Sequence, residues 1–175
     1  MQGTFTGRNL TVRGSVGISS PQTQLRGILQ IEGGNVAPTN QGLLSGLDEI
    51  LIDHDGILTM TGSTFNDQID DAIPIHSRGG QINMYGSYQL PGVETLGTVH
   101  LERGFTRLLA SAEGGTLPTS LSVSTLERDR GAILYCRQVA LGSAKILNPA
   151  PLQYGIIGPW AVTDDKKFAA LLDGP

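Results

Sequence analysis

The sequence predicts an all-β fold, a β-solenoid of about six rungs that forms one continuous domain. Glycine is abundant, with 24 of 175 residues, and only 16% of the residues are charged, against 39% that are hydrophobic. Short runs that alternate apolar and polar residues recur at nearly even spacing. Alternation with a period of two residues is typical of β-strands. A strand–turn–strand unit of about 24 residues that recurs along a chain is typical of a solenoid.

Five glycines mark the repeat, and their separations are 29, 24, 24 and 27 residues. We expect each of them at the bend between two faces, where the chain needs a positive φ or a missing side chain. These turn glycines are Gly27, Gly56, Gly80, Gly104 and Gly131. Leu10 and Val12 fit the same columns without a leading glycine.

Aligning the units on these glycines predicts two columns of core side chains, stacked at about 4.8 Å per rung. The inward column consists of Ile31, Met60, Met84, Leu108 and Tyr135. Its companion column consists of Leu29, Leu58, Ile82, Thr106 and Ile133. Alternation then sends Cys136 outward or into a neighbouring layer, and Trp160 is expected to cover the open end of the apolar core.

The runs that precede the glycines, such as "EILID", "AIPIH", "GTVHL" and "SLSVS", are expected to be the other strand of each unit. Loops are expected at 34–46, 63–70, 87–93 and 111–120, where turn-forming residues gather. Residues 1–150 are expected to hold the solenoid repeats, and residues 151–175 a C-terminal strand or cap-like segment. A strand-like run follows Met1 almost at once, so we expect an excerpt of a longer chain.

Composition excludes several classes of protein. A net charge of −4 and scattered arginines argue against binding to nucleic acid. The apolar stretches are too short to span a bilayer. One cysteine excludes an internal disulfide framework but leaves an extracellular location open.

Five segments, in this order, resemble the repeats of the autotransporter-associated β-strand repeat proteins of bacterial surfaces. They are "GILTMTGS", "DDAIPIHSRGGQINMYGS", "ETLGTVHL", "STLERDRGAILYC" and "GIIGPWAVTDDKKFAAL". The resemblance implies a right-handed parallel β-helix that is secreted and belongs to a long passenger region with a structural or adhesive duty. It supplies no catalytic residues that can be carried over.

The histidines His76 and His100 are the first candidates for a binding site. Each lies four residues before a repeat glycine, so the two are expected in one outward column on adjacent rungs. Stacked imidazoles can ligate a transition metal, and Glu102 is the nearest carboxylate in sequence. The alternative is a solvent-facing ladder, and on balance we predict no metal and no cofactor.

The acidic residues are the second candidates, as a calcium site or as a glycosidase pair. They are Asp53, Asp55, Asp67, Asp70 and Asp71. Asp53 and Asp71 are the two that could approach each other in adjacent rungs for hydrolysis of a sugar. Turns and a charged rim are the favoured interpretation.

Cys136 is the third candidate, as a nucleophile beside Arg130 and Arg137. No histidine lies near it in sequence, so a packed, unreactive thiol is favoured.

These observations favour a non-enzymatic structural or adhesive segment of a bacterial cell-surface or extracellular protein, able to stack end to end. Its expected partners are neighbouring repeats or further copies, with surface glycans or host molecules beyond them. No nucleic acid and no membrane span are expected. A β-helical carbohydrate-active enzyme or binding module is the alternative, and a trimeric phage fibre or capsid-associated β-helix is a further one.

Overall fold

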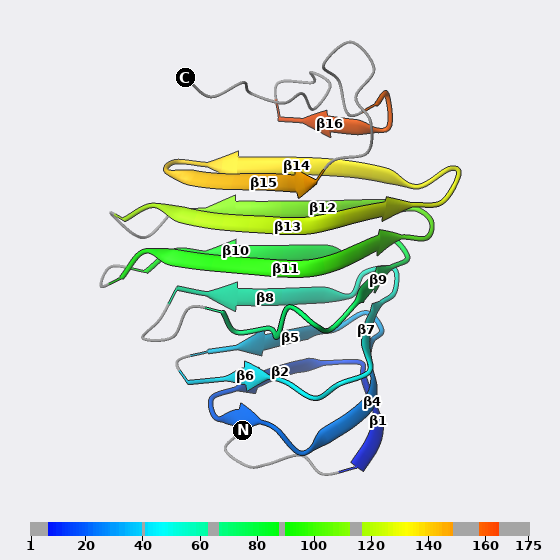
Figure 1. The fold of residues 1–175 in the computed structure, drawn as a ribbon, viewed down its shortest axis with the longest axis vertical. Coiled ribbons are helices and arrows are strands. Elements are labelled where there is room, and N and C mark those ends of the chain that lie inside the picture. Colours follow the sequence, from blue (N-terminus) through cyan, green and yellow to red (C-terminus); the bar gives the residue numbers. More distant parts are fainter. Residues whose placement is uncertain are drawn as a thin grey trace.

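The computed structural model describes residues 7–39, 41–62, 67–87, 90–112, 117–148 and 158–164. The predicted fold class is confirmed: these residues form parallel sheets that stack into a solenoid, and no helix occurs among them (Figure 1). Each of the two main sheets has seven strands, close to the expected six rungs. Among the described residues, no helix is long and apolar enough to cross a membrane.

The first sheet holds, in spatial order, β1 (Gly7–Val12), β4 (Leu25–Ile31), β7 (Glu49–Ile52), β9 (Ile75–Ser77), β11 (Gly92–Leu101), β13 (Thr119–Arg128) and β15 (Gly142–Asn148). The second sheet holds β2 (Ser15–Ile18), β5 (Asn35–Pro38), β8 (Ile57–Thr61), β10 (Gln81–Tyr85), β12 (Phe105–Ser111), β14 (Ile133–Val139) and β16 (Ala161–Thr163). A small third sheet pairs β3 (Pro21–Gln22) with β6 (Leu43–Leu44).

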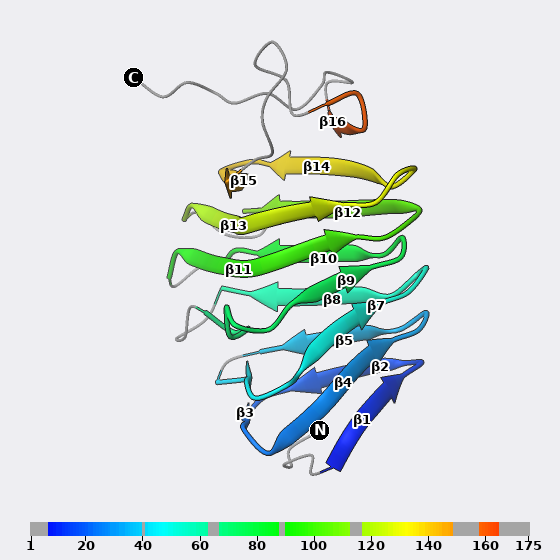
Figure 2. The same ribbon diagram turned by 45° about the vertical axis from the view of Figure 1, so that its right-hand side comes forward.

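Each rung runs along the first sheet, turns, and returns along the second. In Figure 1 the nearer strands β11 and β13 point right, the more distant β10 and β12 point left, and the chain rises, which is the right-handed sense. Figure 2 shows that β1, β4 and β7 cross the coil obliquely, as the twist of stacked strands requires.

The core lies between the two sheets. Met60 and Met84 are register partners on β8 and β10, and both are fully buried, as the alignment predicted. Leu58, Ile82 and Leu108 form the neighbouring column, also in register and buried. Identical apolar positions therefore stack on one another through the middle of the coil, and burial of this surface stabilises the fold.

The prediction that Ile133 and Tyr135 face the core is wrong. Ile133 pairs with Phe105 on the outer surface and is 43% exposed, and the Tyr135 ring lies against the Phe105 ring. The reason is that Ala132 adds a residue between the turn glycine and β14, which reverses the alternation. Leu134 and Cys136 are consequently the buried residues, so of the two placements expected for Cys136 the outward one is excluded.

Gly27 is not a turn glycine, and the columns at Leu29 and Ile31 belong to the first sheet. Leu29 pairs with Ile50, and Ile31 pairs with Ile52. Their pairing with Leu10 and Val12 agrees with the alignment. Strands of both sheets alternate apolar and polar residues in the same way, so this pattern alone does not indicate to which sheet a strand belongs. Strand β5 accordingly occupies part of the segment 34–46 that was expected to be a loop.

The prediction that Thr106 stacks on Ile82 is wrong as well. Thr106 is buried, but its register partner is Leu134, and Ile82 pairs with Leu108. Three residues separate Ser77 from Gln81, whereas five separate their register partners Leu101 and Arg107, so the β10–β12 ladder begins two residues later on β12. A Cβ atom on Gly104 would come within 3.2 Å of the Cα atom of Gly79, so these two glycines, both with positive φ, stack on each other.

Trp160 lies where the second sheet ends, just before β16. It is partly buried against the core, and the guanidinium of Arg128 lies 4.8 Å from the centre of its ring. This position suits the expected cover of the last rungs. The predicted division at residue 150 falls within 149–157, outside the described residues.

Candidate functional site

Two columns of polar side chains run along the outer face of the first sheet, next to the turn that leads to the second. His76 and His100 are register partners in one column, with Glu127 as the next member. Two residues further along each strand, the second column contains Arg78, Glu102 and Asp129. Residues two apart on a strand share a face, so the members of both columns project from the same outer surface.

His76, His100 and Glu102 come together at the centre of these columns, and we call them the histidine cluster. One ligand atom from each lies within 4.8 Å of the others. The imidazole Nδ1 of His76 is 3.0 Å from Oε1 of Glu102, and the two rings have centres 5.5 Å apart. The side chains are half-buried, with exposed fractions of 24–26%. The prediction of one histidine column on adjacent rungs is therefore confirmed.

Carboxylates surround the histidine cluster. Nε2 of His100 is 3.0 Å from Oδ1 of Asp129, and Nε2 of His76 is 3.8 Å from Oε2 of Glu49. The other oxygen of Glu102 accepts a hydrogen bond of 2.6 Å from Nε of Arg78. This bond lowers the pKa of Glu102, burial opposes the effect, and His76 adds to the lowering, so Glu102 is ionised at neutral pH.

A groove of about 530 Å³ lies over the turn beside the cluster, and Asp53, Arg78 and Arg103 are among the residues that line it. Nη1 of Arg78 is 3.7 Å from Oδ1 of Asp53, so this carboxylate has a cationic partner. Asp55 lies elsewhere on the turn, largely exposed and 2.9 Å from Nδ1 of His54.

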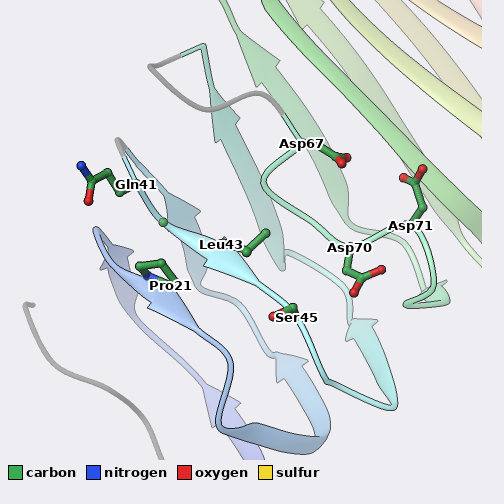
Figure 3. A pocket seen from close by; sticks show the side chains of 8 residues that line it. Pro21, Gln41, Leu43, Ser45, Asp67, Asp70 and Asp71 are labelled. Carbon is green, nitrogen blue, oxygen red and sulfur yellow. The ribbon is translucent and has the colours of Figure 1, made fainter.

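The aspartate pocket is a second hollow, of about 520 Å³, at the small third sheet (Figure 3). Figure 3 shows Asp67, Asp70 and Asp71 on the one loop that precedes β9, with Leu43 and Ser45 opposite them. Burial, together with the charges of Asp67 and Asp70, raises the pKa of Asp71. Oδ1 of Asp70 accepts the backbone N–H of Ala72, a bond typical of a turn.

Adjacent rungs do not bring Asp53 and Asp71 together, as the glycosidase alternative would require. Asp53 lines the groove over the turn that follows β7, whereas Asp71 lines the aspartate pocket. The two residues lie at opposite ends of the first-sheet strands, because Asp53 directly follows β7 and Asp71 precedes β9. These two carboxylates therefore do not form the acid and base of a glycosidase.

Cys136 lies in the core, and burial raises the pKa of its thiol to about 11. Its neighbour in sequence, Arg137, lies 3.8 Å from a carboxylate oxygen of Asp164 instead, and Arg130 is exposed. A buried, protonated thiol is a poor nucleophile, so the arrangement suits the predicted packed residue.

Sequence reasoning missed the partners of the histidine cluster and one buried acid. The strand register would have identified three of these partners, because each lies two residues from a position of the histidine column. They are Arg78, Glu49 and Asp129. Glu94 carried a misleading signal. Counting in twos from the buried Val99 points Val93 inward and Glu94 outward, whereas the structure buries Glu94 and leaves Val93 exposed.

Comparison with protein-family models, with curated proteins and with solved structures gives no match for this chain. The resemblance to the autotransporter-associated repeat proteins therefore stays a prediction from the quoted segments.

Proposed function

We propose that this chain is a non-enzymatic structural module of a bacterial cell-surface or extracellular protein, and that it extends by stacking on further rungs at its ends. The observation that supports this proposal most directly is the continuity of the parallel sheets. Every strand from β4 to β13 in the first sheet has a neighbour on both sides, and the same ladder order runs through the second. Such a coil lengthens by adding rungs without any change in its cross-section.

The outer edges of β1 and β2 support this proposal. Among the described residues, no strand pairs with either edge. Gly14 and Ile18 direct their carbonyl groups to β5, where they accept the N–H groups of Asn35 and Thr39. The backbone groups of Ser15 and Gly17 therefore point away from β5, because alternate residues of a strand face opposite neighbours. An unpaired edge of this kind is a template for a further strand.

The association of copies tests the proposal. Light scattering over a concentration series is expected to show mass increasing in steps of one chain, because head-to-tail pairing does not close on itself. Val12 directs its carbonyl group to the N–H of Glu32, so Thr11, like Gly17, faces outward. A variant with Thr11→Pro and Gly17→Pro therefore loses one outward N–H donor on each of β1 and β2 and is expected to stay monomeric. Thr11→Ala with Gly17→Ala keeps those N–H groups and serves as the matched control. A wild-type chain that stays monomeric at every concentration would contradict stacking between copies.

The aspartate pocket favours a second candidate, action on or binding of a carbohydrate. Burial and the charges of Asp67 and Asp70 raise the pKa of Asp71, and a carboxyl group with a raised pKa can serve as the general acid in chemistry on a sugar. Release of reducing ends from a panel of polysaccharides that is lost in Asp71→Asn would establish this candidate. The exposed Asp55→Asn, away from the pocket, is its control.

A further inference from the structure

Against the prediction of no metal made from the sequence, we propose that the histidine cluster of His76, His100 and Glu102 is a binding site for a divalent transition-metal ion of the zinc type. Two imidazoles and one carboxylate are a ligand set that zinc and its neighbours accept, whereas calcium and magnesium require oxygen ligands. The register of β9 and β11 delivers the two histidines to each other, and Glu102 follows on the same outer face.

The spacing of the ligand atoms suits one ion. A tetrahedral ion with bonds of about 2.0–2.2 Å holds its ligand atoms roughly 3.3 Å apart. Nδ1 of His76 and Oε1 of Glu102 already lie 3.0 Å apart. All three ligand atoms lie within 4.8 Å of one another, so small movements of the side chains suffice to reach the spacing of a bound ion.

The groups around the cluster resemble the supporting shell of a metal site. Metal-bound histidines usually direct their second nitrogen to a carboxylate, which orients the ring. Here Nε2 of His100 faces Asp129 at 3.0 Å and Nε2 of His76 faces Glu49 at 3.8 Å. Nδ1 of His76 is then directed to Glu102, and Nδ1 of His100 has only a 4.0 Å contact with Oε2 of Glu127. Arg78 holds the second oxygen of Glu102 at 2.6 Å and so fixes that carboxylate.

Charge and access favour a cation. Glu49, Glu102, Glu127 and Asp129 lie beside the two histidines, and Arg78 is the cation paired with this group in the described part of the chain. The ligand side chains are about one quarter exposed, so an ion can enter from solvent and keep a water molecule as its fourth ligand. The bound ion would tie β9, which is only three residues long, to β11.

Calorimetric titration of the full chain with ZnCl₂ tests the proposal. We expect one ion per chain, with affinity at least tenfold weaker in His76→Ala and in His100→Ala, because each removes a ligand. His54→Ala is the matched control, since His54 is exposed and lies outside the cluster, and we expect it to bind zinc as the wild type does. Equal binding by the wild type and the two cluster variants would overturn the proposal, as would loss of binding in His54→Ala.

A second measurement uses only the folded wild-type chain, in case a variant fails to fold. Cobalt(II) bound by two imidazoles and a carboxylate gives visible absorption bands whose strength reports low coordination number. We expect these bands on addition of CoCl₂, and their loss on addition of zinc. A spectrum identical to that of aqueous cobalt, or bands that added zinc does not remove, would overturn the proposal.

Discussion

The carboxyl group of Glu94 lies inside the coil, where its two oxygens accept the backbone N–H groups of Gln68 at 2.7 Å and Ile69 at 3.2 Å. Ile69 takes part only in an isolated bridge with Leu44, so regular strand pairing is interrupted here. Glu94 satisfies donors that a continuous ladder would otherwise have paired. Burial raises its pKa to about 8, against the lowering effect of these two hydrogen bonds.

The stability of the protein is therefore expected to fall as the pH rises from about 4.5 to about 8. In this window the folded state keeps the Glu94 proton that the unfolded state has released, so the folded state binds more protons. The full shift corresponds to roughly 3–5 kcal/mol of unfolding free energy, and the loss levels off above the raised pKa. Urea unfolding at several pH values measures this slope. Glu94→Gln should remove it, and Glu127→Gln, on the exposed surface, should keep it.

The direction of alternate residues on β14 gives a second prediction. Leu134 is fully buried, and Ile133 is 43% exposed. Leu134→Ala is expected to cost about 2–5 kcal/mol of unfolding free energy, because it leaves a cavity in the core. Ile133→Ala is expected to cost less than about 1 kcal/mol, in line with a surface position. Equal costs in denaturant unfolding would contradict the register of β12 with β14 and restore the alignment based on Gly131.

At the scale of the strand, Gly97 interrupts the alternation of β11. Leu96 pairs with Val123 and Thr98 with Thr125, and the ladder skips the residue between them. Inward positions are even-numbered before Gly97 and odd-numbered after it, which is how Glu94 and Val99 are both buried. A Cβ atom on Gly97 would lie 1.8 Å from the carbonyl oxygen of Asp71. The chain bends at Gly97 because only glycine allows this close approach.

Gly97→Ala is expected to destabilise the protein by about 1–3 kcal/mol or more, because the backbone of Asp71 must move. Gly17→Ala on β2 is the matched control, since its Cβ atom would meet nothing within 4 Å. We expect Gly17→Ala to be neutral or to stabilise by about 0.5–1 kcal/mol, because alanine loses less backbone freedom on folding. Thermal unfolding of the two variants separates these outcomes, and equal melting temperatures would rule out the contact at Gly97.

The sequence was sufficient for the fold class and for the histidine pair, because both depend on a repeat that counts residues correctly from β9 to β11. It was insufficient wherever a single residue shifts the alternation of inward and outward side chains. Ala132 shifts Ile133 outward, and Gly97 shifts Glu94 inward; neither change alters the apolar composition of its run. The carboxylates around His100 were hidden for a related reason, because they become neighbours only through strand register.

At the scale of the whole molecule, stability in a solenoid comes from each rung and from its contacts with the rungs on either side. A central strand such as β10 has two neighbours in its sheet, and β2 has one. Local opening therefore requires the least free energy at the ends of the coil. Pairing with a further copy would supply the missing neighbour.

Hydrogen exchange over a concentration series is expected to distinguish central strands such as β10 from edge strands such as β2. Amides of Met84 and its neighbours on β10 should be protected at every concentration, because each side of this strand is already paired. The outward N–H groups of Ser15 and Gly17 should exchange fast in dilute solution and become protected as copies stack on β2. The Thr11→Pro and Gly17→Pro variant should show no such gain at Ser15. Protection of Ser15 and Gly17 that is already complete in dilute solution would mean that the edge of β2 is covered within one chain, and it would contradict head-to-tail stacking of copies on that edge.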